Sequence, residues 1–334
     1  MRWLVRILSG LVLLALIGVV YQLAGEALDS RRYPPPGRLV DVGGHRLHLS
    51  CTGEGNPTVI LEAAGPGWSL YWSTVQPEIA KRTRVCSYDR AGFGWSESGP
   101  SPRTGRRIAT ELHTLLAQAG ISGPYLLVGH SLGGFVVRLY RHFHPTDVVG
   151  MVLVEAGQET ELRRSEFRKF IHAGKTTLPL FTALTALDIS RLLTSFDFLP
   201  PLFAEQEAKV PAEIRPMLRA GWLQTDYPIT LADEAVSLGE TVDQVQRAGS
   251  LGNLPLIVLT ATGPIWWPDM SADIDQAKFR ETWLQLQTEL TNLSSDSRQI
   301  FAEHSSHLIN FDQPELIVDA VRQLLETGKQ AHRQ

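Results

Sequence analysis

The sequence predicts an α/β fold in which a mostly parallel β-sheet is flanked by helices. Segments 38–42 and 45–49 alternate apolar and polar residues around Gly43-Gly44, which predicts a β-hairpin of two half-exposed strands. Helical periodicity separates most of the later strand candidates, for example over 104–119 and 314–325. Those strand candidates are short runs, apolar on both faces as in a buried parallel sheet: 58–61, 84–88, 125–128, 150–154, 256–260 and 299–302.

The bulk composition is that of a globular protein with a large core. The chain has 334 residues, of which 43% are hydrophobic and 20% charged. This length fits one catalytic domain with additional segments. The formal net charge is -4, and no run of Lys or Arg exceeds two residues. The chain therefore lacks the basic patch that a nucleic acid partner requires.

The amino-terminal segment differs from the rest of the chain. Over 7–25 there is no charged residue, and only Ser9 and Gln22 are clearly polar. Since roughly 20 apolar residues cross a bilayer, the segment predicts a single-pass membrane anchor. Arg2 and Arg6 precede it, so the positive-inside rule places the amino terminus in the cytoplasm and the body outside it.

Two other interpretations of this segment remain open. Gly25-Glu26-Ala27 offers a small-x-small cleavage site, so a cleaved signal peptide would give a secreted or periplasmic protein. A buried core helix is the third possibility.

The expected organisation follows from these boundaries. Residues 1–28 form the anchor or signal peptide, and the Pro-rich segment 29–37 is an extended spacer. The α/β core comprises 38–157 and 254–327, and 328–334 is a polar tail.

The remaining segment, 158–253, interrupts the α/β alternation. It shows helical periodicity, several prolines and no convincing strand, which predicts a helical insertion acting as a lid. Within it, 192–203 is rich in Leu, Phe and Pro. This composition fits ordinary helix packing, or an apolar surface that lines an acyl pocket or touches the membrane.

A nucleophile motif follows the strand candidate 125–128. The sequence Gly129-His130-Ser131-Leu132-Gly133 has the G-x-S-x-G pattern and leads into an apolar helical stretch, 135–143. A strand, this pattern and then a helix are what a nucleophile elbow requires, because the serine sits on a tight turn between residues without bulky side chains. We expect Ser131 to be the nucleophile, with a purely structural turn as the alternative.

A serine hydroxyl needs a base to remove its proton. In the chain order serine, acid, histidine, that base lies late in the sequence. Three histidines follow the insertion: His304, His307 and His332. His307 stands in a short loop between the last strand and the last helix, so we expect it to be the base. His304 is the alternative, and His332 lies in the polar tail.

Three motifs follow one another along the chain: Tyr88-Asp89-Arg90-Ala91-Gly92-Phe93-Gly94-Trp95-Ser96, Gly129-His130-Ser131-Leu132-Gly133-Gly134 and His307-Leu308-Ile309-Asn310-Phe311-Asp312-Gln313-Pro314. In this order they resemble the α/β-hydrolase superfamily, in its bacterial esterase and prolyl-aminopeptidase-like branch. The resemblance covers about 38–325, with the insertion only loosely matched. It implies an eight-stranded sheet and a Ser-acid-His triad.

The acid of the triad departs from the family pattern. Most relatives carry it in a Gly-x-x-Asp-like turn after the strand 256–260, where this chain has Gly263-Pro264-Ile265-Trp266. Some members draw it from the end of the preceding strand, and Glu155 directly follows 150–154. We expect Glu155 to be the acid, with Asp269 or Asp273 as alternatives and capping of the lid's first helix as a structural role for Glu155.

An oxyanion hole requires two backbone N–H donors. Leu132, directly after the nucleophile, is one expected donor. The second comes from the loop after the third strand, where relatives carry His-Gly and this chain has Ala63-Ala64. Because Pro66 has no N–H, Gly65 is the expected donor and Ala64 the alternative; a purely structural Pro-Gly turn is the other interpretation.

The chain contains two cysteines, Cys51 and Cys86, and no CxxC motif, so neither a zinc site nor a redox motif is supported. In the sheet order that the resemblance implies, their strands are adjacent. We hypothesise that they form a disulfide if the domain is extracytoplasmic, and otherwise are two buried thiols. Asp89 and Arg90 are expected to form an internal ion pair that holds their loop.

These predictions describe a serine hydrolase that cleaves an ester or amide bond through an acyl-enzyme, without a cofactor or metal. A serine at the elbow, where dehalogenases and epoxide hydrolases of this superfamily use aspartate, disfavours their alkyl-enzyme route. An acyltransferase would use the same triad. A membrane-anchored, non-catalytic binding protein on this scaffold is the alternative, favoured by the two departures from the family pattern.

Overall fold

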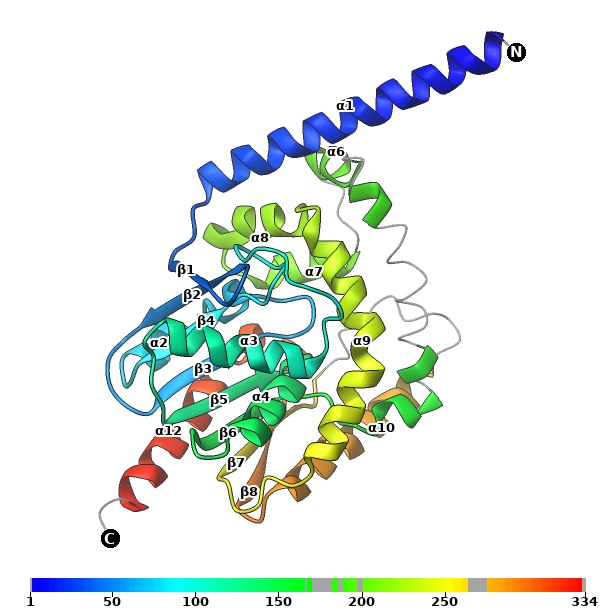
Figure 1. The fold of residues 1–334 in the computed structure, drawn as a ribbon. Coiled ribbons are helices and arrows are strands. Elements are labelled where there is room, and N and C mark those ends of the chain that lie inside the picture. Colours follow the sequence, from blue (N-terminus) through cyan, green and yellow to red (C-terminus); the bar gives the residue numbers. More distant parts are fainter. Residues whose placement is uncertain are drawn as a thin grey trace.

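The structure, a computed structural model, describes residues 2–165, 167–169, 182–185, 189–196, 201–263 and 275–331. It contains an eight-stranded sheet in the order β1-β2-β4-β3-β5-β6-β7-β8 (Figure 1). The strands are β1 (Arg38–Asp41), β2 (Arg46–Thr52), β3 (Thr58–Glu62), β4 (Val85–Tyr88), β5 (Tyr125–His130), β6 (Val148–Val154), β7 (Leu256–Ala261) and β8 (Ser297–Ala302).

The sheet is parallel except at one edge. The β1–β2 hairpin and the β2–β4 pair are antiparallel, and every other pair, from β3–β4 to β7–β8, is parallel. This confirms the predicted fold class, a mostly parallel sheet of eight strands. The central apolar runs form strands because both of their faces are covered, and all residues of β3 and β5 are buried. The run expected at the end of the sheet forms the edge strand β8, of which only Ala302 is buried.

Helices cover the two faces of the sheet, as Figure 1 shows. On one face, α3, α4 and α9 pack over strand residues such as Leu127; on the other, α2 and α12 pack over the alternate residues, such as Leu126. Truncating a buried leucine of this kind to alanine typically costs roughly 2–5 kcal/mol. The helices of the core are α2 (Gln76–Ala80), α3 (Gly105–Gln118), α4 (Leu132–Phe143), α10 (Gln276–Glu289), α11 (Ile309–Asp312) and α12 (Pro314–Ala331), with 3-10 turns η1 (Ser69–Trp72) and η4 (Leu290–Leu293).

Residues 158–253 lie between β6 and β7, and we call this segment the cap. In its described residues the regular structure is helical, apart from an isolated β-bridge at Gly252. An aromatic cluster attaches it to the core, where Trp68 and Tyr71 pack with Trp222 and Tyr227 of the cap. The cap contains η2 (Glu161–Arg163), α6 (Ile189–Ser195), α7 (Pro201–Lys209), η3 (Ala212–Ile214), α8 (Arg215–Trp222) and α9 (Asp226–Ala248).

The amino-terminal helix α1 (Arg2–Arg32) is longer than predicted. Among the described residues it is the one helix long and apolar enough to cross a membrane, with a mean hydropathy of 2.4 over its best window. The helix runs four residues into the predicted spacer 29–37, which corrects that boundary. The extension has a physical cause, because side chains of its last turns, including Glu26 and Asp29, bind the cap.

The two cysteines form a disulfide bond, as hypothesised. Cys51 on β2 and Cys86 on β4 are direct partners across this antiparallel pair. A bridge between residues 35 positions apart stabilises the folded state by about 4 kcal/mol when it restricts the unfolded chain.

Candidate active site

Ser131 lies in a sharp turn between β5 and α4. Its φ is 54° and its ψ is -119°, a conformation that residues with a side chain rarely adopt. Among the described residues, Glu155 is the other non-glycine with a positive φ, at 45°. A strained backbone of this kind costs of order 1–3 kcal/mol and is typical of functional sites. The local geometry is therefore that of the predicted elbow.

Close packing explains the glycines of the motif. A Cβ on Gly129 would lie 2.7 Å from the carbonyl oxygen of Gly133, and a Cβ on Gly133 would lie 2.6 Å from that of Ala63. A Cβ on Gly134 would lie 2.5 Å from the Cβ of Ala156. Because these neighbours are mostly backbone atoms, only glycine allows the turn to sit so close to β3 and β6.

His307 lies beside this turn, in the loop between β8 and α11. The Nε2 atom of His130 is 2.9 Å from the carbonyl oxygen of His307. Since a carbonyl can only accept, Nε2 of His130 carries the hydrogen and donates it. Burial lowers the pKa of His130 to about 3, which keeps its ring neutral. The residue before Ser131 thus holds the backbone of the expected base against the elbow.

The carboxylate of Glu155 meets the ring of His307. Nδ1 of His307 is 3.1 Å from Oε2 of Glu155, and both side chains are buried. Oε1 accepts the backbone N–H of Ala261 (2.7 Å), and Oε2 also accepts Nε1–H of Trp283 (2.8 Å). An ionised carboxylate can only accept hydrogen bonds, so Nδ1 of His307 carries the hydrogen in this contact. Nε2 is then the basic nitrogen of the His307 ring.

The alternative residues of the sequence prediction do not join this arrangement. His304 is exposed, and its backbone N–H donates to Oε1 of Gln313. Asp269, Asp273 and His332 lie outside the described residues. Of the acids and histidines considered for the triad, Glu155 and His307 are the two within the described residues that the fold brings together.

The loop of His307 is tied to the cap through Asp312. Its carboxylate accepts the backbone N–H (2.8 Å) and the hydroxyl (2.5 Å) of Ser306. It also pairs with Nζ of Lys209, on α7, at 2.7 Å. An ion pair therefore links α7 of the cap to the loop that carries His307.

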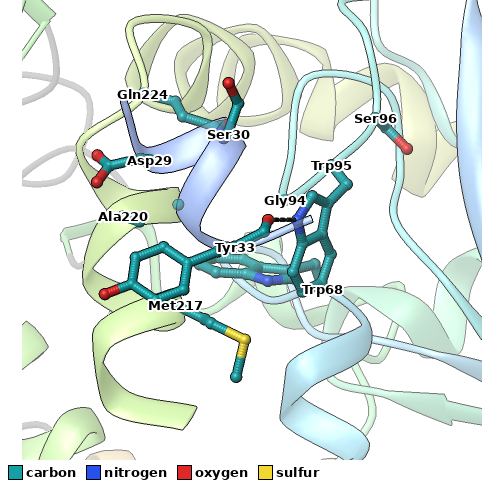
Figure 2. Close-up of a pocket in the computed structure, with 11 residues that line it drawn as sticks. Asp29, Ser30, Tyr33, Trp68, Gly94, Trp95, Ser96, Met217, Ala220 and Gln224 are labelled. Atoms are coloured by element: carbon teal, nitrogen blue, oxygen red, sulfur yellow. Dashed lines mark hydrogen bonds between the residues drawn. The ribbon is translucent and has the colours of Figure 1, made fainter. Parts of the chain in front are cut away.

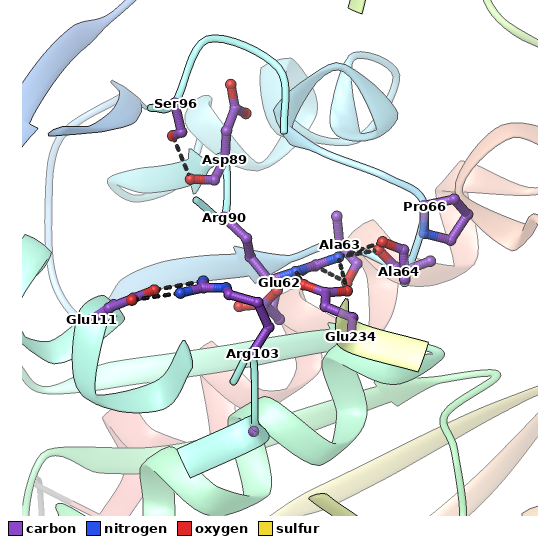
Figure 3. A network of polar contacts seen from close by, with 12 residues as sticks. Glu62, Ala63, Ala64, Pro66, Asp89, Arg90, Ser96, Arg103, Glu111 and Glu234 are labelled. Atoms are coloured by element: carbon purple, nitrogen blue, oxygen red, sulfur yellow. Dashed lines mark hydrogen bonds and ion pairs between the residues drawn. The ribbon is translucent and has the colours of Figure 1, made fainter. Parts of the chain in front are cut away.

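The loop after β3, residues 63–67, carries the expected second oxyanion donor, and we call it the oxyanion loop after this expected role. A Cβ on Gly65 would lie 3.9 Å from the side chain of Leu132, so this loop faces the residue after the nucleophile. Arg90 donates to the carbonyl oxygens of Ala63 (2.9 Å), Ala64 (2.8 Å) and Gly65 (2.6 Å), as Figure 3 illustrates. In a trans peptide the C=O and the next N–H point in opposite directions. The N–H groups of Ala64 and Gly65 therefore point away from Arg90.

The ion pair expected between Asp89 and Arg90 does not form. Arg90 is buried and pairs with Glu62 and Glu234, each at 2.8 Å (Figure 3). Asp89 lies 3.0 Å from the ring of His48 and also accepts backbone N–H groups. The prediction was wrong because side chains of consecutive residues in extended chain point to opposite sides. Sequence neighbours at this strand end therefore meet different partners.

The charged network around Arg90 is buried in the core below the cap. Burial raises the pKa of Glu62 to about 6, and the neighbouring Arg90 partly offsets this rise. Burial also raises the pKa of Glu234, which belongs to α9 of the cap. Arg90 thus joins β3, the oxyanion loop and the cap.

A cavity of about 170 Å³ lies between the core, α8 and the end of α1 (Figure 2). Tyr33, Trp68, Trp95 and Met217 line it, and neither Ser131 nor His307 does. Trp68 comes directly after the oxyanion loop in the sequence, but no residue of that loop lines the cavity.

The eight-stranded, mostly parallel sheet and its flanking helices define the α/β-hydrolase class of fold. The alpha/beta hydrolase fold family matches residues 57–314, which is more than half of the chain. The chain belongs to this family.

Similar proteins agree on the fold and differ in activity. A thermophilic esterase from Thermogutta terrifontis is 18% identical, with a TM-score of 0.60 over 87% of this chain and 98% of that one. The epoxide hydrolase CorEH is 19% identical, with a TM-score of 0.58 over 87% of this chain and 98% of that one. At these identities the likeness shows the fold alone.

One sequence relative is a much longer protein. A Hormonema carpetanum protein named as a transporter, efuK, is 35% identical over 139 residues, which are 39% of this chain and 20% of the relative. The match thus spans about a fifth of the relative's length.

Proposed function

We propose that this protein is a serine hydrolase that cleaves ester or amide bonds with Ser131 as nucleophile, His307 as base and Glu155 as acid. The observation that carries the proposal is the 3.1 Å contact between Nδ1 of His307 and Oε2 of Glu155. It supports a triad because the carboxylate selects the tautomer whose Nε2 can accept a proton.

The proposed reaction has two steps. Nε2 of His307 takes the hydroxyl proton as Oγ of Ser131 forms a bond to the carbonyl carbon, and the carbonyl electrons move to oxygen. As the tetrahedral adduct collapses, the bond to the leaving alcohol or amine breaks and the imidazolium supplies its proton. Water, deprotonated by His307, then attacks the acyl-enzyme, and Ser131 recovers its proton as the acid leaves.

The oxyanion is proposed to receive N–H groups from Leu132 and from Gly65, with Ala64 as the alternative. The support is the position of Gly65, where an added Cβ would lie 3.9 Å from the side chain of Leu132, and the anchoring of the loop carbonyls by Arg90. Donors held in place before the reaction stabilise the developing charge without reorganisation. Loss of one such donor costs about 10²–10³ in kcat.

We propose that α1 anchors the domain to a membrane with the body extracytoplasmic and the cap, residues 158–253, acting as a lid. The apolar length of α1 supports the anchor. The Cys51–Cys86 disulfide supports an oxidising compartment. Both features are consistent with Arg2 and Arg6 lying on the cytoplasmic side.

Labelling with a fluorophosphonate probe tests the nucleophile. The wild type should be labelled, and Ser131→Ala should not be. Ser295→Ala, which changes an exposed serine, is the matched control and should be labelled at the wild-type rate. A folded wild type that stays unlabelled would instead support a binding protein on this scaffold.

A further inference from the structure

The last turns of α1 carry a polar stripe that binds the cap. Gln22, Glu26 and Asp29 are spaced four and three residues apart, so they share one face of the helix. Gln22 donates to the carbonyl of Leu223 (2.6 Å), and Glu26 accepts the backbone N–H of Thr225 (2.7 Å). Gln22 is 2% exposed, although no residue in the most apolar window of the helix is buried. The stripe therefore attaches α1 to the end of α8.

The same stripe binds α6. Nη1 of Arg191 pairs with Asp29 at 2.6 Å, and its Nε donates to Gln22 at 3.2 Å. A Cβ on Gly25 would lie 2.6 Å from Nε of Arg191. A glycine at this position, between Gln22 and Asp29, therefore allows the side chain of Arg191 to approach α1 closely. Figure 1 shows α6 beside α1. The position of α6 is therefore set relative to the anchor helix.

The residues on both sides of Arg191 expose a large apolar surface. In α6, Leu192 is 50% exposed and Ile189 and Leu193 are also exposed, and Phe196, directly after α6, is 77% exposed. Exposed apolar patches mark surfaces that bind another apolar phase. Gln22 is the first clearly polar residue after the apolar run 10–21, so its partner Arg191 lies at the level where that run ends.

We propose that α6 is a second membrane contact, whose apolar residues enter the surface of the lipid bilayer that α1 crosses. The inference rests on the proposed anchor and not on the proposed catalysis. The bilayer is the partner that the geometry favours, because Arg191 bonds α6 to α1, the proposed membrane-spanning helix, and the exposed apolar residues of α6 are the neighbours of Arg191. The cap is thereby held against the membrane on one side.

Depth-dependent quenching in the full chain tests this contact. The protein is reconstituted into phosphatidylcholine vesicles with Phe196→Cys carrying an NBD fluorophore; the native cysteines are bonded and do not react under non-reducing conditions. The matched control is Val236→Cys on α9, which is 70% exposed. Nitroxide lipids should quench the label at 196 several-fold more than the label at 236. Equal, weak quenching at both positions would overturn the proposal.

A label in the anchor separates the two hypotheses. Leu14→Cys should be quenched if α1 crosses the bilayer, whatever α6 does. Strong quenching at 14 with none at 196 refutes the α6 contact alone, and no quenching at 14 refutes the anchor on which it rests.

The polar stripe supplies a second test. Glu26→Ala combined with Asp29→Ala removes its acceptors for Thr225 and Arg191. Quenching at 196 should fall toward the value at 236, while quenching at 14 stays unchanged. Undiminished quenching at 196 would contradict the role of the stripe in placing α6.

Discussion

Two buried glutamates stand at the ends of the strands on either side of β5 and have different partners. Glu62 ends β3 and Glu155 directly follows β6, and both strands pair with β5, which leads to Ser131. Glu155 receives the ring of His307, the indole of Trp283 and a backbone N–H. Glu62 receives Arg90 and the hydroxyl of Tyr88 instead.

The difference teaches that the partner decides what a buried carboxylate does. An imidazole changes its protonation near neutral pH, so a carboxylate beside it can stabilise the imidazolium that forms during the reaction. A guanidinium stays protonated throughout, so Glu62 can only help to hold Arg90 in place. We therefore expect activity to depend on Glu155 and its partners, and the stability of the folded state to depend on Glu62 and its partners.

The largest effect is expected at the imidazole. His307→Ala removes the base, and kcat on a p-nitrophenyl ester should fall on the order of 10⁶-fold, as for other triads. His304→Ala changes the exposed neighbour and should leave kcat nearly unchanged. The reverse order of the two variants would move the base to His304.

Arg90 should affect both activity and stability. Arg90→Gln leaves two glutamates without their buried partner, which costs roughly 3–5 kcal/mol of the free energy of unfolding. It also releases the carbonyls of the oxyanion loop, so kcat per titrated active site should fall by about 10²-fold.

The matched control for Arg90 is Arg103. Arg103 is buried and binds Glu111 through two hydrogen bonds of 2.6 and 2.7 Å, away from the oxyanion loop. Arg103→Gln should lower the stability while kcat per titrated site stays near the wild-type value. An equal loss of kcat in both variants would show that Arg90 acts through stability alone.

Trp283 should have a smaller effect on the Glu155 side. Trp283→Phe keeps an aromatic ring beside Phe167 and removes the donor to Oε2 of Glu155. A hydrogen bond to a charged group contributes about 1.5–3 kcal/mol, so we expect kcat to fall by about tenfold. Steady-state kinetics at pH 8 measures it, and an unchanged kcat would contradict the role of the indole in holding the carboxylate.

The smallest expected effect concerns stability and pH at Glu62. Burial raises its pKa to about 6 from an ordinary value of 4.5, so the folded state favours the protonated form. Its contribution to stability is therefore complete below about pH 4.5 and is lost as the pH rises through 6. The loss amounts to about 2 kcal/mol.

Urea unfolding of wild type and Glu62→Gln between pH 4 and 7.5 checks this expectation. The free energy of unfolding of the wild type should decrease with pH by about 2 kcal/mol more than that of the variant. The kcat of Glu62→Gln should stay within a few-fold of the wild type. Parallel pH curves for the two proteins would contradict the assigned pKa.

The fold was predictable because buried parallel strands leave a strong signal. All eight strand candidates became strands. Six of them are runs that are apolar on both faces, as in a buried parallel sheet, and the two strands of the hairpin were predicted from their alternating pattern. The end of α1 was not predictable. It depends on contacts of Glu26 with Thr225, a residue 199 positions later, which no local pattern reveals.

The candidate site was predictable where a residue's role follows from its place on the fold. Ser131, Glu155 and His307 each stand just after a strand of the same sheet, and their catalytic roles stay predictions. Trp283 and His130 were missed. Trp283 belongs to a helix of ordinary composition, and its contact with Glu155 joins residues 128 positions apart.

The central claim is that Glu155 takes the place of the acid that most relatives carry after the next strand. The most direct test is kcat of Glu155→Gln beside Asp269→Asn on a soluble p-nitrophenyl ester. Glu155→Gln should lose about 10³–10⁴-fold, because the imidazole loses its charged partner and its preferred tautomer, and Asp269→Asn should lose little. A large loss in Asp269→Asn with an active Glu155→Gln would contradict the account.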